Sequence, residues 1–269
     1  MPDRDRSRIF SPAHYAGGAA ILSSAVLFFF QTPWAAAPPA CFVLACAVAS
    51  LSPRSRFFLP VISRGLTDRR TVALTFDDGP DPLTTPHLLA LLSQRRVTAA
   101  FFVSGRNAVR HPELIRRILG DGHAVGNHSC SHDPFLMLSP HRRLFREIAA
   151  AQDALKGFGI RPLAFRPPVG LTNPKLPSVL GALGMFCVTF SCRAFDRGNR
   201  RIEGMAGKIL RRVRPGDIVL LHDVRPRGEN GVARWLQEVE SILDGLAAKD
   251  LQAVSLAELI GRPVMETSG

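Results

Sequence analysis

The chain divides into an apolar leader and a longer part in which short β-prone runs alternate with helical ones. Residues 16–30 are almost wholly apolar, and after a short polar break residues 34–51 contain no charge. Each stretch is near the lower limit of length for crossing a bilayer. We therefore predict one or two transmembrane helices, at about 16–30 and 34–51, within an N-terminal membrane segment and linker that covers residues 1–70.

The charges around the leader predict its orientation. Arginines precede the first apolar stretch and follow the second: Arg4, Arg6, Arg8, Arg54, Arg56 and Arg64. In a helical hairpin both sets lie on the cytoplasmic side by the positive-inside rule, so the C-terminal part faces the cytoplasm. If Pro38 and Pro39 interrupt the second span, a single crossing places that part outside. A cleaved signal peptide is the main alternative, but a second apolar stretch directly afterwards argues against simple secretion. We favour the hairpin, in a bacterial-type inner membrane.

After residue 70 the pattern predicts alternating strands and helices. The expected strands are 71–76, 99–103, 123–126, 163–165, 186–190, 217–221 and 252–254. The expected helices are 86–94, capped by Thr84 or Thr85, then 112–119, 140–158, 174–183, 202–213 and 232–248. This alternation favours an α/β fold with a parallel sheet, open or closed into a barrel, as one catalytic domain over residues 71–269.

Composition and charge exclude several classes of protein. The formal net charge is +12, but the basic residues are spread along the chain without interleaved aromatics, so we expect no nucleic-acid partner. Such basicity is more typical of a solvated face or of a nearby anionic membrane surface. The five cysteines lack paired spacing and do not describe a disulfide framework. Zinc-ribbon, phosphate-loop and dinucleotide-binding signatures are also missing from the sequence.

Polar residues follow the carboxyl ends of the predicted strands. They are Asp77, Asp78, His128, His132, Arg166, Asp196, His222 and Asp223. Active sites of parallel α/β folds lie at that edge of the sheet. We therefore expect these side chains to gather at one rim.

Two of these segments suggest a metal site. Asp77 and Asp78 end an apolar strand, and adjacent side chains on an extended segment point opposite ways, so one can bind a metal while the other takes a proton. The alternative is a plain Asp-Gly turn. His128 and His132 are spaced i, i+4, which on a helical turn places both rings on one face. With one carboxylate they form a facial site for a divalent metal; the alternative is a chance pair on an exposed turn.

Two further segments offer a cation and a proton donor. Arg166, followed by two prolines, is suited to hold a carboxylate by a forked hydrogen bond, and the stiff turn after it can aim a main-chain N–H. His222 ends a buried strand and titrates in the pH range useful for proton donation. Taken singly, both segments are more often ordinary loops.

In combination and order these segments resemble the polysaccharide deacetylases of the NodB homology class, carbohydrate esterase family 4, from about residue 71 to residue 260. The resemblance implies a distorted (β/α) barrel, preceded here by the hydrophobic helical segment. It also implies one divalent metal, usually zinc, with other divalent transition metals as alternatives. The implied reaction is hydrolysis of N-acetyl groups on amino sugars.

The resemblance also implies a role for each site residue. These roles are a general base (Asp77), metal ligands (Asp78, His128, His132), a general acid (His222), residues that position the base and the acid (Arg166, Asp196), a main-chain oxyanion donor (Val169) and a lining residue of the acetyl pocket (Leu220). The chain departs from the family pattern at three positions. Val169 stands where a tyrosine is frequent, Arg193 where an acidic residue is usual and Arg197 where an aromatic is usual. These departures affect the expected substrate more than the expected chemistry.

Three functions remain open from the sequence. The first is deacetylation of an N-acylated amino sugar, polymeric or lipid-linked, with membrane lipid as a second partner. The second is a deformylase or other amidohydrolase acting on a lipid-linked substrate. The third is a catalytically silent glycan-binding protein on the same fold, which calls for a missing base, acid or ligand, and none is missing. The sequence leaves the oligomeric state open.

Overall fold

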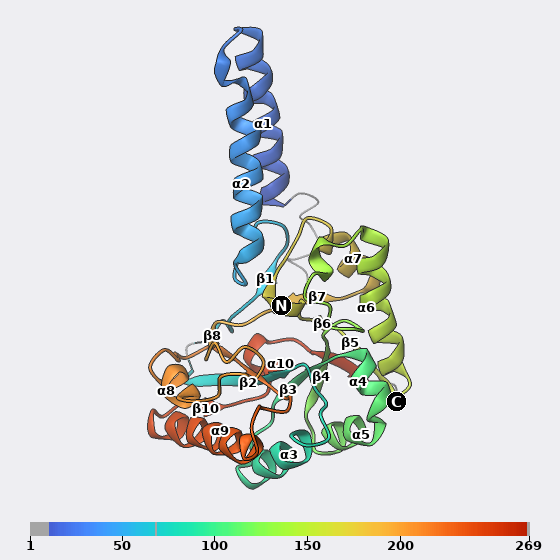
Figure 1. Ribbon diagram of the computed structural model, residues 1–269, viewed down its shortest axis with the longest axis vertical. Coiled ribbons are helices and arrows are strands. Elements are labelled where there is room, and N and C mark those ends of the chain that lie inside the picture. Colours follow the sequence, from blue (N-terminus) through green and yellow to red (C-terminus); the bar gives the residue numbers. More distant parts are fainter. Residues whose placement is uncertain (1–10, 68, 268–269) are drawn as a thin grey trace.

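A helical hairpin projects from an α/β body in the computed structural model, which describes residues 11–67 and 69–267 (Figure 1). The hairpin consists of α1 (Pro12–Phe29), a 3-10 helix η1 (Pro33–Ala36) and α2 (Ala37–Leu51). Both helices are long and apolar enough to cross a membrane, by length and composition. Arg4, Arg6 and Arg8, on which the predicted orientation partly rests, lie outside the described residues.

The two prolines in the second apolar stretch do not break it. Pro38 and Pro39 lie in the first turn of α2, where a missing N–H leaves no hydrogen bond unmade. The hairpin also contacts the body at its base, because Ala13 N donates to Phe57 O at 3.0 Å and Thr172 N donates to Ser50 O at 3.3 Å. The second stretch is therefore a continuous helix whose end lies beside the α/β body.

The body is built on a curled parallel sheet whose strand order is β1-β7-β6-β4-β3-β2-β9-β8. These strands are β1 (Val61–Ile62), β2 (Thr71–Asp77), β3 (Ala100–Val103), β4 (Ala124–Asn127), β6 (Ala164–Phe165), β7 (Phe186–Val188), β8 (Cys192–Arg193) and β9 (Ile218–His222). A further strand, β10 (Gln252–Ala253), pairs with the start of β2. Separate from this sheet, β5 (Ile160–Pro162) and β11 (Met265–Thr267) form an antiparallel ribbon.

The sheet forms an incomplete barrel with its gap between β1 and β8. The chain itself crosses this gap, because β7 and β8 follow one another in sequence. Thr189 N donates to Ile62 O at 2.9 Å on one side, and Ser191 N donates to Ile218 O at 3.1 Å on the other. The predicted distorted (β/α) barrel is confirmed, and its irregularity comes from this three-residue crossing.

Most of the helices cover the outside of the sheet, whereas α10 (Leu256–Ile260) contributes Leu256 and Leu259 to the interior cluster. The others are α3 (Thr85–Gln94), α4 (Gly105–Arg110), α5 (Pro112–Gly120), η2 (Leu136–Leu138), α6 (His141–Lys156), η3 (Pro168–Gly170), α7 (Leu176–Leu183), α8 (Met205–Leu210) and α9 (Gly231–Ala248). Each predicted strand and each predicted helix has a counterpart among the observed elements. The elements that the sequence pattern missed are short: α4, α10, η2, η3, β1, β5, β8 and β11. The predicted helix at 202–213 is shorter because Gly204, with φ of 66°, precedes its first turn.

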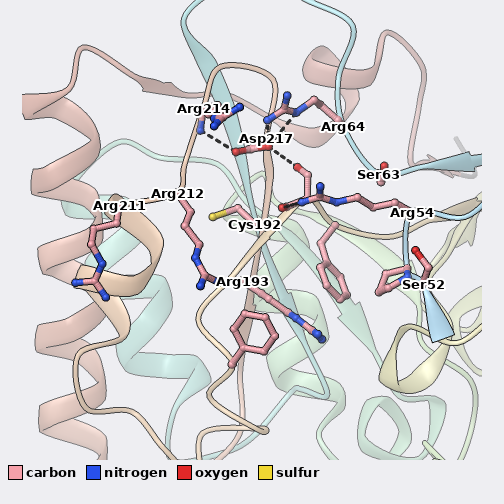
Figure 2. A pocket seen from close by; sticks show the side chains of 14 residues that line it. Ser52, Arg54, Ser63, Arg64, Cys192, Arg193, Arg211, Arg212, Arg214 and Asp217 are labelled. Atoms are coloured by element: carbon pink, nitrogen blue, oxygen red, sulfur yellow. Dashed lines mark hydrogen bonds and ion pairs between the residues drawn. The ribbon is translucent and has the colours of Figure 1, made fainter.

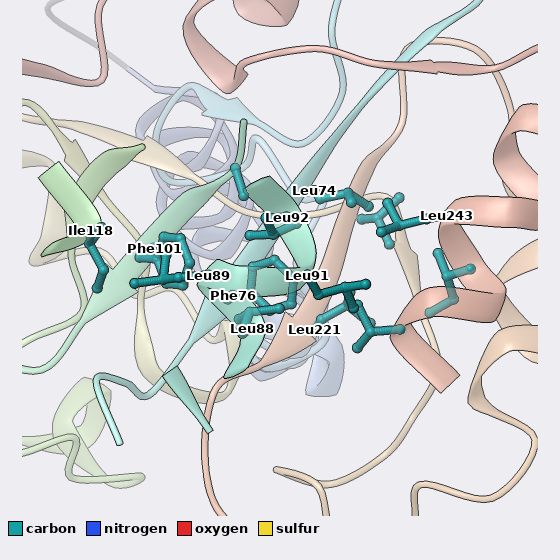
Figure 3. Packing of buried hydrophobic residues seen from close by; sticks show 14 of the residues in the cluster. Leu74, Phe76, Leu88, Leu89, Leu91, Leu92, Phe101, Ile118, Leu221 and Leu243 are labelled. Atoms are coloured by element: carbon teal, nitrogen blue, oxygen red, sulfur yellow. The ribbon is translucent and has the colours of Figure 1, made fainter. Parts of the chain in front are cut away.

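Alternation along β2 separates two cores. Leu74 and Phe76 point outward and pack against Leu88 and Leu92 of α3 in the larger hydrophobic cluster (Figure 3). Each fully buried leucine or phenylalanine contributes about 1.5–3 kcal/mol relative to an exposed one. The inward-facing positions carry smaller residues, such as Ala73, which belongs to the barrel interior. The outer core thus stabilises the sheet. Inside the barrel, polar side chains lie at the carboxyl ends of the strands.

Candidate active site and metal centre

Four strands each direct one polar side chain to the interior at the carboxyl end of the barrel. Each lies two positions beyond an interior residue, on the same face of its strand: Asp77 after Thr75, His128 after Gly126, Arg166 after Ala164 and His222 after Leu220. The period of two along each strand therefore aligns these side chains. The structure brings them together with Asp78, His132 and Asp196.

Asp78, His128 and His132 form a compact group of metal-ligand atoms. Asp78 Oδ1 lies 2.9 Å from His132 Nε2 and 3.3 Å from His128 Nε2, and the ligand atoms of all three lie within 4.8 Å of one another. His128 Nδ1 lies 2.7 Å from Arg166 O, to which it donates, so Nε2 of the neutral ring carries the lone pair. Lone pairs and a carboxylate oxygen that face one another are suited to a cation.

The orphaned oxygen of Asp78 agrees with this fit. Asp78 Oδ1 is buried and has no hydrogen-bond partner among the described residues. Burial raises the pKa of Asp78, but the contacts and charges of His128 and His132 outweigh it and hold this pKa well below its usual range. An ionised carboxylate and two imidazoles are a donor set typical of zinc and related divalent metals.

The histidine pair is not helical, so the predicted helical turn is wrong. Residues 128–132 form a loop in which Ser129 and His132 have left-handed φ angles of 66° and 53°. Asn127 Oδ1 accepts from Ser129 N at 2.8 Å, and Cys130 N donates to Glu147 O on α6. These tertiary contacts bend the loop so that the two rings still meet, with centroids 4.8 Å apart.

Arg166 is fully buried and holds Asp77 in one orientation. Its Nη1 donates to Asp77 Oδ1 at 2.6 Å and to Thr75 Oγ1 at 2.8 Å, while Nη2 donates to Thr189 O at 2.9 Å. The guanidinium also stacks over Phe102 at 3.9 Å. Only one nitrogen therefore reaches the carboxylate, instead of the forked pair we expected. Asp77 Oδ2 is left facing the metal-ligand group.

His222 is held by Asp196, a residue from the loop after β8. His222 Nδ1 donates to Asp196 Oδ2 at 2.7 Å. Burial lowers the pKa of His222, but the hydrogen bond and charge of Asp196, with the charges of Asp78 and Asp77, outweigh it and raise this pKa to about 9. The imidazole is therefore protonated at neutral pH, as a proton donor must be.

Asn199 is a positioning residue that the sequence pattern missed. Its backbone N–H donates to Asp196 Oδ2 at 3.2 Å, and its side chain donates to His222 O at 2.9 Å and to Val224 O at 2.7 Å. Asn199 thus ties the loop of the carboxylate to the strand of the histidine. The turn sequence Asp-Arg-Gly-Asn from Asp196 was the available signal, because aspartate and asparagine form such turns.

Val169 and Leu220 flank this group. Val169 is half exposed and has φ of 53°, a strained value for a β-branched residue, in the turn that follows Arg166. Leu220 is buried in the interior cluster that also contains Phe102 and Phe190. The structure thus places Val169 at the surface and Leu220 just beneath His222.

Asp223 lies behind the group and not in it. Its carboxylate accepts hydrogen bonds from Thr84 Oγ1 at 2.7 Å and from Thr85 Oγ1 at 2.6 Å. We expected one of these threonine hydroxyls to cap α3. Neither does, although Thr84 occupies the N-cap position. Burial raises the pKa of Asp223 to about 7. We assign Asp223 to the packing between β9 and the start of α3.

Comparison with known proteins identifies the family. The family model described as polysaccharide deacetylase matches residues 64–188. A peptidoglycan-N-acetylglucosamine deacetylase of Bacillus cereus is 32% identical over 195 residues, which cover 72% of this chain and 89% of that protein. The chain belongs to the polysaccharide deacetylase family. A chitooligosaccharide deacetylase of Bradyrhizobium is 36% identical over 162 residues, covering 60% of this chain and 74% of that protein.

Solved structures of the polysaccharide deacetylase family share this fold. A crystal structure of a peptidoglycan N-acetylglucosamine deacetylase superposes with a TM-score of 0.69 at 28% identity, covering 76% of this chain and 94% of the other. The chitin deacetylase of Colletotrichum lindemuthianum gives a TM-score of 0.65 at 29% identity, covering 76% and 92%. The chain is accordingly a deacetylase-type hydrolase that acts on carbon–nitrogen bonds other than peptide bonds.

Proposed function

We propose that this deacetylase removes the N-acetyl group from N-acetylglucosamine units of a glycan, in a reaction that depends on one divalent metal, with zinc the expected ion. The observation that carries this proposal is the metal-ligand group of Asp78, His128 and His132, which lies beside one oriented proton acceptor and one oriented proton donor. These two groups are the Arg166-held carboxylate of Asp77 and the Asp196-held imidazole of His222.

The residues divide the chemistry between them. A bound divalent ion would make water more acidic and polarise the amide carbonyl. Asp77, fixed by Arg166, is placed to take the proton of the attacking water through Oδ2. His222, protonated at neutral pH, gives its proton to the departing amine.

The turn after Arg166 completes the proposed site. The Val169 N–H would donate to the oxygen on which negative charge develops, and one such donor is commonly worth about 3–4 kcal/mol. The left-handed conformation of Val169 holds that turn in shape. Leu220 would line the space for the acetyl methyl group, because it lies on the face of β9 that carries His222.

The named relatives guide the choice of substrate. They act on N-acetylglucosamine of peptidoglycan and on chitooligosaccharides, which favours an oligomeric or polymeric amino sugar here. A second candidate is a lipid-linked amino sugar, acetylated or formylated. The end of α2 favours it, since Pro53 Cγ lies 3.3 Å from a Cβ built on Gly170, in the turn that carries Val169.

The membrane is part of this proposal. We propose that α1 and α2 anchor the protein as a hairpin, with the catalytic body on the cytoplasmic side, in keeping with Arg54, Arg56 and Arg64 after the second helix. A reporter fused to the C-terminus is expected to be active in the cytoplasm. Activity of that reporter only outside the cytoplasm would overturn the orientation.

Metal analysis together with a deacetylation assay tests the catalytic proposal. We expect Asp78→Ala and His128→Ala to lose bound metal and acetate release together, by a factor of at least about 100 in rate. His141→Ala and Asp153→Ala, exposed residues of α6, serve as controls and keep both. Acetate and formate release are measured on chitooligosaccharide, peptidoglycan and lipid-linked amino sugars. Full activity of metal-free Asp78→Ala protein contradicts the mechanism, and saturable glycan binding without acyl release at any metal or pH favours the silent alternative.

A further inference from the structure

A cavity of about 660 Å³ lies where the hairpin meets the barrel gap, and arginines dominate its lining (Figure 2). Six arginines line it: Arg54, Arg64, Arg193, Arg211, Arg212 and Arg214. We call this cavity the arginine pocket. Among the lining residues the single carboxylate is Asp217. The residues come from the linker after α2, from β8 and from the segment between α8 and β9, so only folding brings them together.

The one carboxylate is already neutralised. Asp217 Oδ1 pairs with Arg64 Nη2 at 2.5 Å and accepts from Ser191 Oγ at 2.6 Å, while Oδ2 accepts from Arg214 N at 2.7 Å. None of the salt bridges in the described part of the chain involves the other five arginines of the pocket. The six arginines of the lining exceed its one carboxylate by five charges, and Arg54 donates to the backbone oxygen of Ser191.

Contacts on aromatic rings hold part of this charge in place. The Arg193 guanidinium lies 4.2 Å from the ring centroid of Phe195, and that of Arg212 lies 5.5 Å from the same ring. Guanidinium groups that outnumber the carboxylates around one cavity are suited to the oxygens of a phosphate group.

The surroundings of the pocket indicate where such a phosphate comes from. Ser52 and Arg54, directly after α2, line both the pocket and a neighbouring groove of about 610 Å³. The groove follows one face of α2 and is otherwise mostly apolar, through Leu44, Ala45 and Val48. An apolar groove along a membrane helix that opens into a cationic pocket matches the acyl chain and phosphate of a lipid.

We propose that the arginine pocket binds the phosphate group of a membrane lipid, whose chain lies along α2. This inference rests on the proposed membrane anchor and not on the proposed chemistry. The pocket also borders the active site, because Phe190 lines it and lies 3.4 Å from a Cβ built on Gly170. The bound lipid is therefore either a resident anionic phospholipid or the carrier of a lipid-linked substrate, and both present the same phosphate chemistry.

Native mass spectrometry of the full-length protein released from nanodiscs tests the site. The nanodiscs contain phosphatidylcholine with or without phosphatidylglycerol, and the readout is the phosphatidylglycerol that stays bound. The pocket variant is Arg212→Gln with Arg214→Gln, and the control is Arg110→Gln with Arg142→Gln, exposed arginines outside the pocket with the same change in net charge. We expect the pocket variant to bind about 25-fold more weakly, at roughly fivefold per arginine, and the control to match the unaltered protein.

Equal retention by the pocket variant and the control overturns the proposal, because general basicity then explains the binding. Inorganic pyrophosphate is the second probe. If it binds the pocket in phosphatidylcholine nanodiscs while phosphatidylglycerol does not, the ligand is a soluble anion and the lipid assignment is wrong.

Turnover distinguishes the two lipid sources and separates this inference from the catalytic proposal. A higher KM of the pocket variant for a lipid-linked amino sugar, with unchanged hydrolysis of soluble chitooligosaccharide, supports a substrate carrier. Unchanged KM for both, with weaker lipid retention, supports a resident lipid. Loss of acetate release by every protein, with selective lipid binding intact, removes the deacetylase proposal alone.

Discussion

The Asp196 carboxylate, which accepts a hydrogen bond from His222 Nδ1, is the main influence that raises the pKa of the proposed acid. Without the Asp196 carboxylate, burial remains the dominant influence on this imidazole, and burial lowers its pKa. Loss of the Asp196 carboxylate should therefore lower the pKa of His222. A proton donor is active below its pKa and is lost as the pH rises through it.

We expect Asp196→Asn to move the alkaline limb of the activity profile to lower pH. In the unaltered protein His222 stays protonated up to about 9, and in the variant its pKa falls towards or below the ordinary 6.5. The pH dependence of kcat/KM on chitooligosaccharide measures this shift, with Asp153→Asn as an exposed control. An alkaline limb that stays in place would exclude His222 as the acid.

Burial has the opposite effect on Asp223, because it disfavours the charged carboxylate and so raises the pKa. Its pKa in the folded protein is about 7, against an ordinary value of 3.8. Between these values the unfolded chain releases a proton that the folded chain keeps, so the free energy of unfolding falls as the pH rises from 3.8 to about 7. We expect Asp223→Asn to flatten this decline. Urea unfolding at several pH values measures it, and parallel curves for the two proteins would contradict the assignment.

Among the elements, β4 carries a glycine that determines how closely the interior packs. A Cβ added to Gly126 would lie 2.6 Å from two ring atoms of Phe102. Phe102 in turn supports the Arg166 guanidinium, which orients Asp77. The spacing between β4 and β3 therefore influences the orientation of the proposed base through Phe102 and Arg166.

We expect Gly126→Ala to lower the free energy of unfolding by about 1–3 kcal/mol and to reduce kcat without loss of bound metal. The reason is that Phe102 must shift and displace Arg166. Gly181→Ala is the matched control, since a Cβ there meets nothing within 4 Å on helix α7, and we expect it to stabilise by about 0.5–1 kcal/mol. Thermal unfolding, metal content and turnover distinguish the two. Wild-type kcat in Gly126→Ala would show that Phe102 does not position Arg166.

At the scale of the whole molecule, the described residues of the hairpin contact the body at the hairpin base. Two clusters of the described residues, the largest one and the one inside the barrel, contain no residue of α1 or α2, whereas the remaining cluster includes Ala13 and packs against Cys46 and Ala49. The fold of the body should therefore survive removal of the hairpin, with some loss of stability.

We expect a chain of residues 52–269 to fold, to hydrolyse soluble chitooligosaccharide and to leave the membrane fraction. Cell fractionation, thermal unfolding and acetate release measure the three outcomes, with the full-length protein as reference. A truncated chain that still sediments with membranes would show that the hairpin is not the main anchor.

The sequence by itself determined the order of the elements, the apolar hairpin and the polar residues at the strand ends. These features depend on local periodicity, on the backbone limits of proline and on the alternation of side chains along a strand. That is why β2, β3, β4 and β9 were predicted close to their observed bounds. The position of Asp77 and His222 after the carboxyl ends of parallel strands predicted that they gather at one rim.

Only the tertiary structure decided how those residues meet. The loop that bends His128 towards His132, the single-nitrogen contact of Arg166 with Asp77, and the threonines that bind Asp223 in place of capping α3 all depend on distant partners. The contact between Arg166 and Asp77 joins positions 89 residues apart. The arginine pocket likewise collects charges that look scattered along the chain. Such contacts follow from packing the whole chain into one volume, which local backbone preferences do not specify.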